Sequence, residues 1–159
     1  MSVTLTVQDR LDIQDLYTRY AHSFDDADAD AWSALFMPDG RFAPPGIDPV
    51  VGTEALRAFV SNRSTDSPGM RHVIANVLID VDGNEVTGRA YFVCYRLDGD
   101  GGFRLRNFGR YVDKLDRHDG SWRFAVRDVV GELAEGLVDA PFAFGALAVI
   151  QSFDQLLVG

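Results

Sequence analysis

The sequence predicts a single α+β domain, with helices in its first half and an antiparallel sheet in its second. Apolar residues recur at helical spacing up to about residue 60. The second half holds four long β-like runs separated by Asp-Gly turns, which are strong hairpin signals. Helices followed by a meander of strands are typical of a domain whose helices cover one face of a curved sheet. A chain of 159 residues that is 47% hydrophobic suits one such domain with a sizeable core.

The first helix is expected over residues 7–24. Thr6 and Asp9 have the spacing of a capping box, with Asp in place of the usual Glu or Gln. The apolar positions that follow fall at i, i+3 and i+4, as one face of a helix requires. They are Ile13, Leu16, Tyr17, Tyr20, Ala21 and Phe24.

Two shorter helices are expected next. Asp28 is placed to cap the second, which Trp32, Leu35 and Phe36 mark and which the Pro38 turn ends. A short strand is expected at residues 41–43. Thr53 opens the third helix, whose apolar face carries Leu56, Phe59 and Val60.

The second half is expected to form strands over residues 71–82, 85–97, 103–117 and 121–130. The domain therefore spans residues 1–131. The remaining segment, 132–159, is too apolar to lie in water, so we expect it to cover the mouth of a pocket, a neighbouring subunit or both.

Composition excludes several classes of function. A formal net charge of −9 disfavours nucleic acid and anionic membrane surfaces as partners. Cys94 is the only cysteine, which rules out an intrachain disulfide, and its apolar neighbours indicate a small buried core residue. The sequence has no metal-ligand motif, phosphate-binding loop or nucleophile elbow, so we expect no metal and no cofactor. No signal peptide is visible, which favours a cytoplasmic location.

Asp25 and His72 are the candidate catalytic pair. Asp25 continues the apolar stripe of the first helix, so it is predicted to point inward, although a loop carboxylate or helix cap is the ordinary alternative. A buried carboxylate needs a partner. His72 opens a strand-like run and is the natural candidate. Together they would form a carboxylate–imidazole dyad, a simple device for moving a proton at neutral pH.

Other polar residues share the predicted inner face of the sheet. Strict alternation places His72 on one strand face with Ile74, Asn76 and Leu78. Asn107 lies on the third long strand, and Arg127 on the last. An inward arginine would bind an anion or pair with a buried carboxylate, whereas pattern alone favours an exposed side chain.

The chain resembles the SnoaL-like branch of the nuclear transport factor 2-like superfamily. The resemblance covers residues 7–131 and rests on motifs in a characteristic order. These are Ile13-Gln-Asp-Leu-Tyr17, Phe24-Asp25, Ala31-Trp-Ser-Ala-Leu-Phe36, Arg71-His72 with Asn76, Gly109-Arg-Tyr111 and Asp119-Gly-Ser-Trp-Arg-Phe124. It implies a cystatin-like cone of three helices on a strongly curved antiparallel sheet around a deep pocket. Fold alone does not settle function in such a family.

At the site, the resemblance is to scytalone dehydratase and hexachlorocyclohexane dehydrochlorinase. Asp25 and His72 match the acid–base residues of both, Asn107 a pocket asparagine of the first and Arg127 a late arginine of the second. The resemblance implies a lyase, isomerase or polyketide cyclase that abstracts a proton, with Asn107, Tyr20 or Arg127 binding the developing oxyanion or leaving group.

The expected substrate is a small, mostly apolar ring compound, because the predicted pocket lining is aromatic. The lining comprises Phe24, Trp32, Phe36, Phe42 and Phe59. A non-catalytic alternative is a ligand-binding or assembly module, like the small subunit of a ring hydroxylase. A wide apolar face on the meander, predicted at Val77, Ile79, Tyr91 and Val93, would suit a homo-oligomer, a dimer or trimer.

Overall fold

The computed structural model describes residues 3–63, 69–97 and 101–131. Helix α1 spans Val7–Asp25 and begins at the predicted capping box. The Thr6 hydroxyl accepts a hydrogen bond from the Asp9 backbone N–H, and the Asp9 carboxylate accepts one of 2.8 Å from the Thr6 backbone N–H. The expected stripe is buried except for Phe24, which is partly buried, so helical spacing alone predicted this element well. The segment 132–159 lies outside the described residues.

The second helix is shorter than the sequence predicts. Helix α2 spans Ala29–Ser33, with Asp28 as its cap, and the chain then enters strand β1, Phe36–Ala43. Phe36 is therefore a strand residue and not a helical one. The Leu35 carbonyl accepts a hydrogen bond of 2.9 Å from the Phe124 backbone N–H, which pairs this segment with the sheet. Pairing with a buried strand outweighs continuation of a five-residue helix.

The six strands form one sheet in the order β2-β1-β6-β5-β4-β3. Neighbouring strands are antiparallel except for β1 and β6, which are parallel. The expectation of an antiparallel sheet therefore holds for all but one pair. The remaining elements are β2 (Val50–Val51), α3 (Thr53–Arg63), β3 (Met70–Asp82), β4 (Glu85–Leu97), β5 (Phe103–His118) and β6 (Ser121–Gly131).

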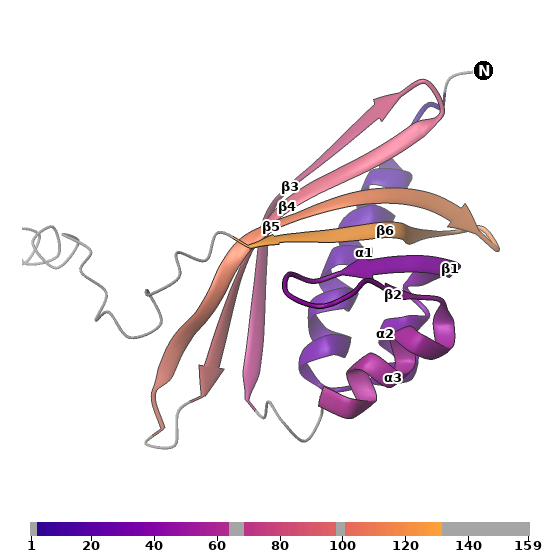
Figure 1. The fold of residues 1–159 in the computed structure, drawn as a ribbon. Helices are drawn as coiled ribbons and strands as arrows, with labels where there is room; N and C mark the ends of the chain where they lie inside the picture. The colour runs from indigo at the N-terminus through magenta and orange to yellow at the C-terminus, as the bar shows by residue number, and fades with distance from the viewer. Residues whose placement is uncertain (1–2, 64–68, 98–100, 132–159) are drawn as a thin grey trace, which may run out of the picture.

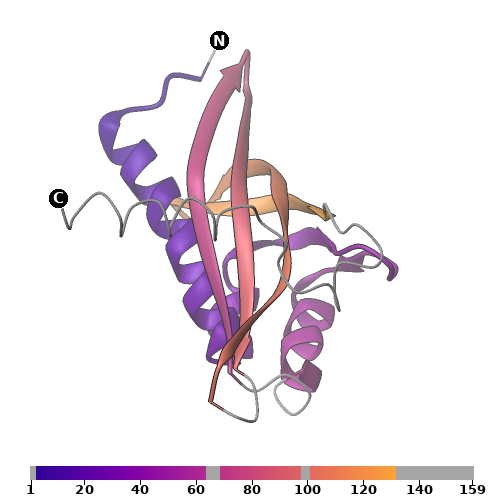
Figure 2. The ribbon, with the colours of Figure 1, turned by 90° about the vertical axis from the view of Figure 1, so that its left-hand side faces the viewer.

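The sheet curves strongly, and the three helices lie against its concave face (Figure 1). Turned by 90°, the structure shows α1 running alongside the long β3–β4 pair, with α3 on the far side of the strands (Figure 2). The core between these layers is largely aromatic and includes Tyr20, Trp32, Phe36, Phe42 and Phe124. None of the helices in the described residues is long and apolar enough to cross a membrane.

A bulge in β3 changes which side chains share a face. The register with β4 shifts between Ala75 and Leu78, and Asn76 adopts a left-handed backbone with φ of 55°. The extra residue reverses the alternation beyond it. As a result Asn76 is exposed and Leu78 is half exposed on the outer face, and neither shares the inner face with His72 as predicted.

Because of the same bulge, two residues of the predicted apolar outer face lie on the inner side of the sheet. Ile79 is buried, and Val77 packs against the core. Tyr91 remains on the outer face, with about half of its surface exposed.

Candidate active site

Asp25 and His72 lie in direct contact. Asp25 is the last residue of α1, and His72 lies near the start of β3, the edge strand against which α1 packs. The ring Nδ1 of His72 is 2.6 Å from Asp25 Oδ1, and the backbone N–H of His72 donates a 2.7 Å hydrogen bond to Asp25 Oδ2. The two side chains are only 8% and 6% exposed. One histidine thus occupies both oxygens of a nearly buried carboxylate.

This geometry fixes which ring nitrogen of His72 carries the proton. A carboxylate only accepts hydrogen bonds, so Nδ1 carries the proton and Nε2 of the neutral ring keeps its lone pair. No group in the described part of the chain holds His72 Nε2 in a hydrogen bond. An imidazole oriented by a carboxylate on one nitrogen, with the other available, is the arrangement of a general base.

Aromatic side chains surround the dyad. The Phe24 ring stands edge-on to the His72 ring at 5.2 Å between centroids, and Phe92 lies 6.5 Å away. Of the predicted lining, only Phe24 contacts His72 directly; Trp32 and Phe59 contact Phe24, and Phe36 and Phe42 contact Trp32 in the core behind it. The low polarity of these neighbours strengthens electrostatic interactions at the dyad.

Two buried polar atoms face this interior without a hydrogen-bond partner in the described structure. They are the indole Nε1 of Trp32, a donor, and Oδ1 of Asn107. Asn107 pairs with Cys94 on β4, and Cys94 pairs with His72 on β3, so these three residues form one row across the inner face. Buried polar atoms are almost always satisfied in proteins, which marks both as candidate ligand contacts.

Arg127 occupies a different environment from the one the pattern favoured. Its side chain is fully buried, and its Nε and Nη2 each donate a 2.8 Å hydrogen bond to Asp113, on the neighbouring strand β5. The expectation of an exposed arginine is wrong, and the alternative, a partner for a buried carboxylate, is correct. Its Nη1 has no hydrogen-bond partner in the described structure.

The ion pair organises a group of buried tyrosines. The Tyr17 hydroxyl donates to Asp113 Oδ2, and the Arg127 guanidinium lies 4.1 Å from the Tyr20 ring centroid and 4.2 Å from that of Tyr111. Burial opposes the charged form of Arg127, but the Asp113 carboxylate outweighs it and raises the pKa of Arg127. Arg127 therefore remains charged within an aromatic cage.

Burial also keeps these tyrosines neutral. It raises the pKa of Tyr20 to about 12, against an opposing effect of the Arg127 guanidinium. Burial, and then the Asp113 carboxylate, raise the pKa of Tyr17, while burial and the neighbouring Tyr20 raise that of Tyr111. All three hydroxyls remain hydrogen-bond donors at neutral pH.

The sequence analysis missed Asp113, Tyr17 and Tyr111 as members of a polar network. A signal was present, because Tyr111, Asp113 and Leu115 alternate on one strand and share its inner face. Strand parity therefore placed Asp113 on the inner face, but only the register of β5 with β6 places it opposite Arg127.

No three His, Cys, Asp or Glu side chains converge as a metal site within residues 3–63, 69–97 and 101–131. A hollow of about 510 Å³ between α1 and β3 borders His72 on another side. It brings solvent to the edge of the site, where Gln14, Thr18 and His22 also line it.

Helices packed on a strongly curved sheet define the class of domain, and sequence comparison identifies the family. The profile of the SnoaL-like domain matches residues 5–128, and the chain belongs to this family. None of the functionally curated proteins matches the chain.

Several solved structures share the fold. Rv3472, a protein of unknown function from Mycobacterium tuberculosis solved as an aspartate-to-asparagine variant, is 29% identical, with a TM-score of 0.73 over 91% of this chain and 85% of that one. An NTF2-like protein with a cystatin-like fold from Novosphingobium aromaticivorans is 27% identical, with a TM-score of 0.71 and 89% of each chain covered. These neighbours confirm the predicted cystatin-like, NTF2-like fold.

A third neighbour was solved with a small molecule. This protein from Catenulispora acidiphila, in complex with S-DNPA, is 25% identical, with a TM-score of 0.72 over 80% of this chain and 96% of that one.

Proposed function

We propose that this protein is a cofactor-independent lyase or isomerase that acts on a small, mostly apolar cyclic substrate. One observation carries the proposal: the 2.6 Å contact between His72 Nδ1 and Asp25 Oδ1, between side chains that are less than a tenth exposed. A nearly buried, oriented imidazole with a free Nε2 suits proton abstraction from carbon. General-base assistance of this kind raises a rate roughly 10²–10⁴-fold.

The reaction starts when Nε2 of neutral His72 removes a proton from a carbon next to a carbonyl or leaving group. The C–H electron pair moves into a new double bond, and charge develops on the carbonyl oxygen or on the departing group. Asp25 stabilises the imidazolium formed. The proton then returns to the leaving group, which completes an elimination such as a dehydration, or to another carbon, which completes an isomerisation.

Trp32 and Asn107 would orient the substrate through their unpartnered buried atoms. The indole N–H donates to a substrate oxygen, and the Asn107 amide oxygen accepts from a hydroxyl. Tyr20 supplies a further neutral hydroxyl for an oxyanion. Arg127 acts indirectly: its Nε and Nη2 bind Asp113, and its guanidinium lies on the rings of Tyr20 and Tyr111 and holds them in place.

Solvent exchange tests the proposal without a known substrate. The protein is incubated in D₂O with a panel of cyclic ketones and enones, and loss of the C–H signal next to the carbonyl is followed by ¹H NMR. We expect exchange above the buffer rate, reduced roughly 10²–10⁴-fold by His72→Gln. His118→Gln is the matched control, because His118 lies at the turn between β5 and β6 and does not line the hollow beside His72, and we expect it to exchange like the wild type.

Full exchange activity in the His72→Gln protein would overturn the proposal. A wild-type protein that binds these rings but exchanges none of their protons would favour the alternative, a non-catalytic ligand-binding or assembly module. An aldol cyclisation of a polyketide needs the same base, so identifying the exchanging compounds would separate cyclase from dehydratase.

A further inference from the structure

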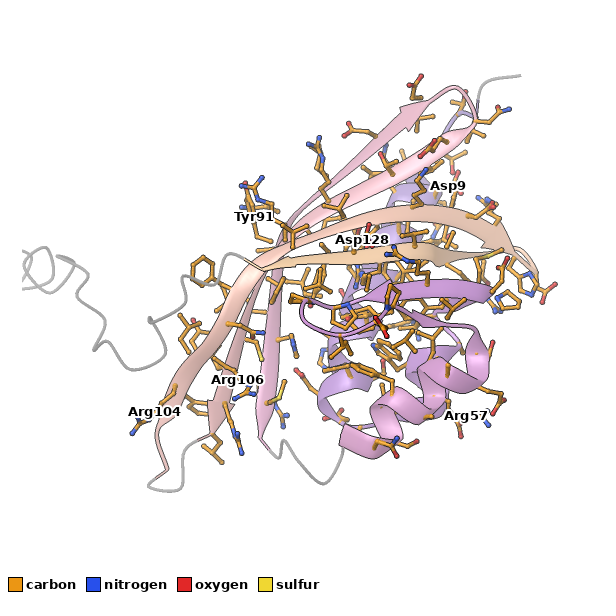
Figure 3. The ribbon with its side chains drawn as sticks, in the orientation of Figure 1. Asp9, Arg57, Tyr91, Arg104, Arg106 and Asp128 are labelled. Carbon is orange, nitrogen blue, oxygen red and sulfur yellow. The ribbon has the colours of Figure 1, made fainter. Side chains whose placement is uncertain are left out.

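The start of β3, the end of β4 and the start of β5 form one corner of the sheet, and this corner is rich in arginine although the whole chain is acidic. Within residues 69–75, 92–97 and 101–108 there are four arginines and no acidic residue, in a chain whose formal net charge is −9. The connecting segments contain Asp66, Asp98 and Asp100, and the Asp25 carboxylate contacts His72, so the four arginines are balanced in number but concentrated on the strands. Arg104 and Arg106 lie near the start of β5 (Figure 3). The other two arginines are Arg71 and Arg96.

The register places this charge beside the dyad. On the inner face, the row His72–Cys94–Asn107 is followed by the row Met70–Arg96–Arg104. Arg96 is therefore the diagonal neighbour of His72 across one strand pair, a separation of about 7–8 Å. Arg106 is the extra residue where the register of β4 and β5 shifts, next to Asn107.

The arrangement is unfavourable for the sheet itself. Arg96 and Arg104 lie directly opposite each other, and like charges at such a position destabilise strand pairing. Arg96 and Arg106 make no ion pair with any other residue that the structure describes. A local violation of this kind is expected where a residue serves binding and not stability.

We propose that Arg96 and Arg106 bind an anionic group of the substrate, a carboxylate or phosphate, while its ring lies beside His72 and Phe24. This inference rests on the proposed function and narrows it: a neutral ring compound would leave both guanidinium groups unused. An arginine fork binds a carboxylate or phosphate through two hydrogen bonds. The guanidinium groups gather on the strands beside His72, so an anion that reaches this corner meets positive charge locally although the whole chain is acidic.

Two fluorescent probes that differ by one anionic group provide the test. 1-Anilinonaphthalene-8-sulfonate carries a sulfonate, and N-phenyl-1-naphthylamine is its neutral analogue. We expect Arg96→Gln and Arg106→Gln each to lower the affinity for the sulfonate probe by about five-fold and to leave the affinity for the neutral probe unchanged. Raising the salt concentration to about 1 M should reduce the preference of the wild type for the sulfonate.

Two controls locate the effect. Arg89→Gln removes an exposed arginine of the same strand β4, at 2.9 Å from Asp80 and distant from the corner, and should change neither affinity. Tyr91→Gln, on the outer face, should also leave both affinities unchanged, because the probes are expected to bind on the inner face. Thermal melts of each variant confirm that it folds, as expected for substitutions at positions that are not buried.

Equal losses for both probes, or no loss for either, would overturn the anion site. If either control substitution weakened the sulfonate probe as much as Arg96→Gln, binding at this corner would also be refuted. The outcome is independent of the exchange experiment: a His72→Gln protein with full exchange would refute the base while the probe preference stood.

Discussion

Removing only one partner of the buried pair Asp113–Arg127 should destabilise the protein strongly. Replacing Asp113 with Leu removes two hydrogen bonds of 2.8 Å from Arg127 and the acceptor of the Tyr17 hydroxyl, and leaves a fully buried guanidinium without a counter-charge. Breaking one side of a buried pair costs about 3–5 kcal/mol. We expect a loss of about 4 kcal/mol in the free energy of unfolding.

Removing both charges should cost much less. Replacing a buried ion pair with apolar residues is often neutral or stabilising by about 1–4 kcal/mol. Here the Tyr17 hydroxyl still loses its acceptor, a penalty of about 1–3 kcal/mol. The double variant Asp113→Leu/Arg127→Met should therefore lose about 2 kcal/mol or less, and the double-mutant cycle should give a coupling energy of at least about 3 kcal/mol.

Urea unfolding of the wild type, both single variants and the double variant measures this cycle. The matched control is the pair Asp80–Arg89, at 2.9 Å but with side chains more than half exposed, for which we expect about 0–1 kcal/mol. A coupling energy for Asp113–Arg127 no larger than that of the surface pair would refute the reasoning.

Three further predictions follow from the site and its supports. Burial raises the pKa of Tyr20 to about 12 and also raises the pKa values of Tyr17 and Tyr111, so above about pH 10 these tyrosines ionise first in the unfolded chain. Urea titrations should therefore show a free energy of unfolding that falls above about pH 10 by about 1.4 kcal/mol per pH unit for each tyrosine. A flat profile would contradict this. Gly88→Ala would place a Cβ 2.2 Å from the Tyr17 hydroxyl, so it should lower the free energy of unfolding by about 1–3 kcal/mol, whereas an unchanged melting curve would show that the contact yields freely. Asp25→Asn should reduce solvent exchange roughly 10²–10⁴-fold in the D₂O assay while ring binding, measured by probe fluorescence, is retained; undiminished exchange would contradict the proposed dyad.

Local periodicity predicted most of the fold. The capping box at Thr6 and the i, i+3, i+4 stripe gave α1 to within one residue at its end, and the Asp-Gly turns gave the four long strands. The boundary between α2 and β1 was missed because it depends on pairing with Phe124, far along the chain. Such non-local pairing leaves no periodic signal near Phe36.

The contact between Asp25 and His72 followed from chemistry, since an inward carboxylate requires a partner. The position of Asn76 did not follow, because alternation assumes an unbroken strand and the bulge shifts the parity by one. Asn tolerates the left-handed backbone, so no local signature separated this site from regular strand. Pattern alone favoured an exposed Arg127, which was wrong, because only the register with Asp113 shows that the side chain is buried and its charge is neutralised.

The tautomer of His72 tests the central claim most directly. In ¹⁵N-labelled protein, with the ring neutral, the account predicts a protonated Nδ1 and an unprotonated Nε2, because Nδ1 lies 2.6 Å from Asp25. The Asp25→Asn protein should lose this preference. A neutral His72 ring with its proton on Nε2 in the wild type would contradict the account, because that nitrogen could then take no proton from a substrate.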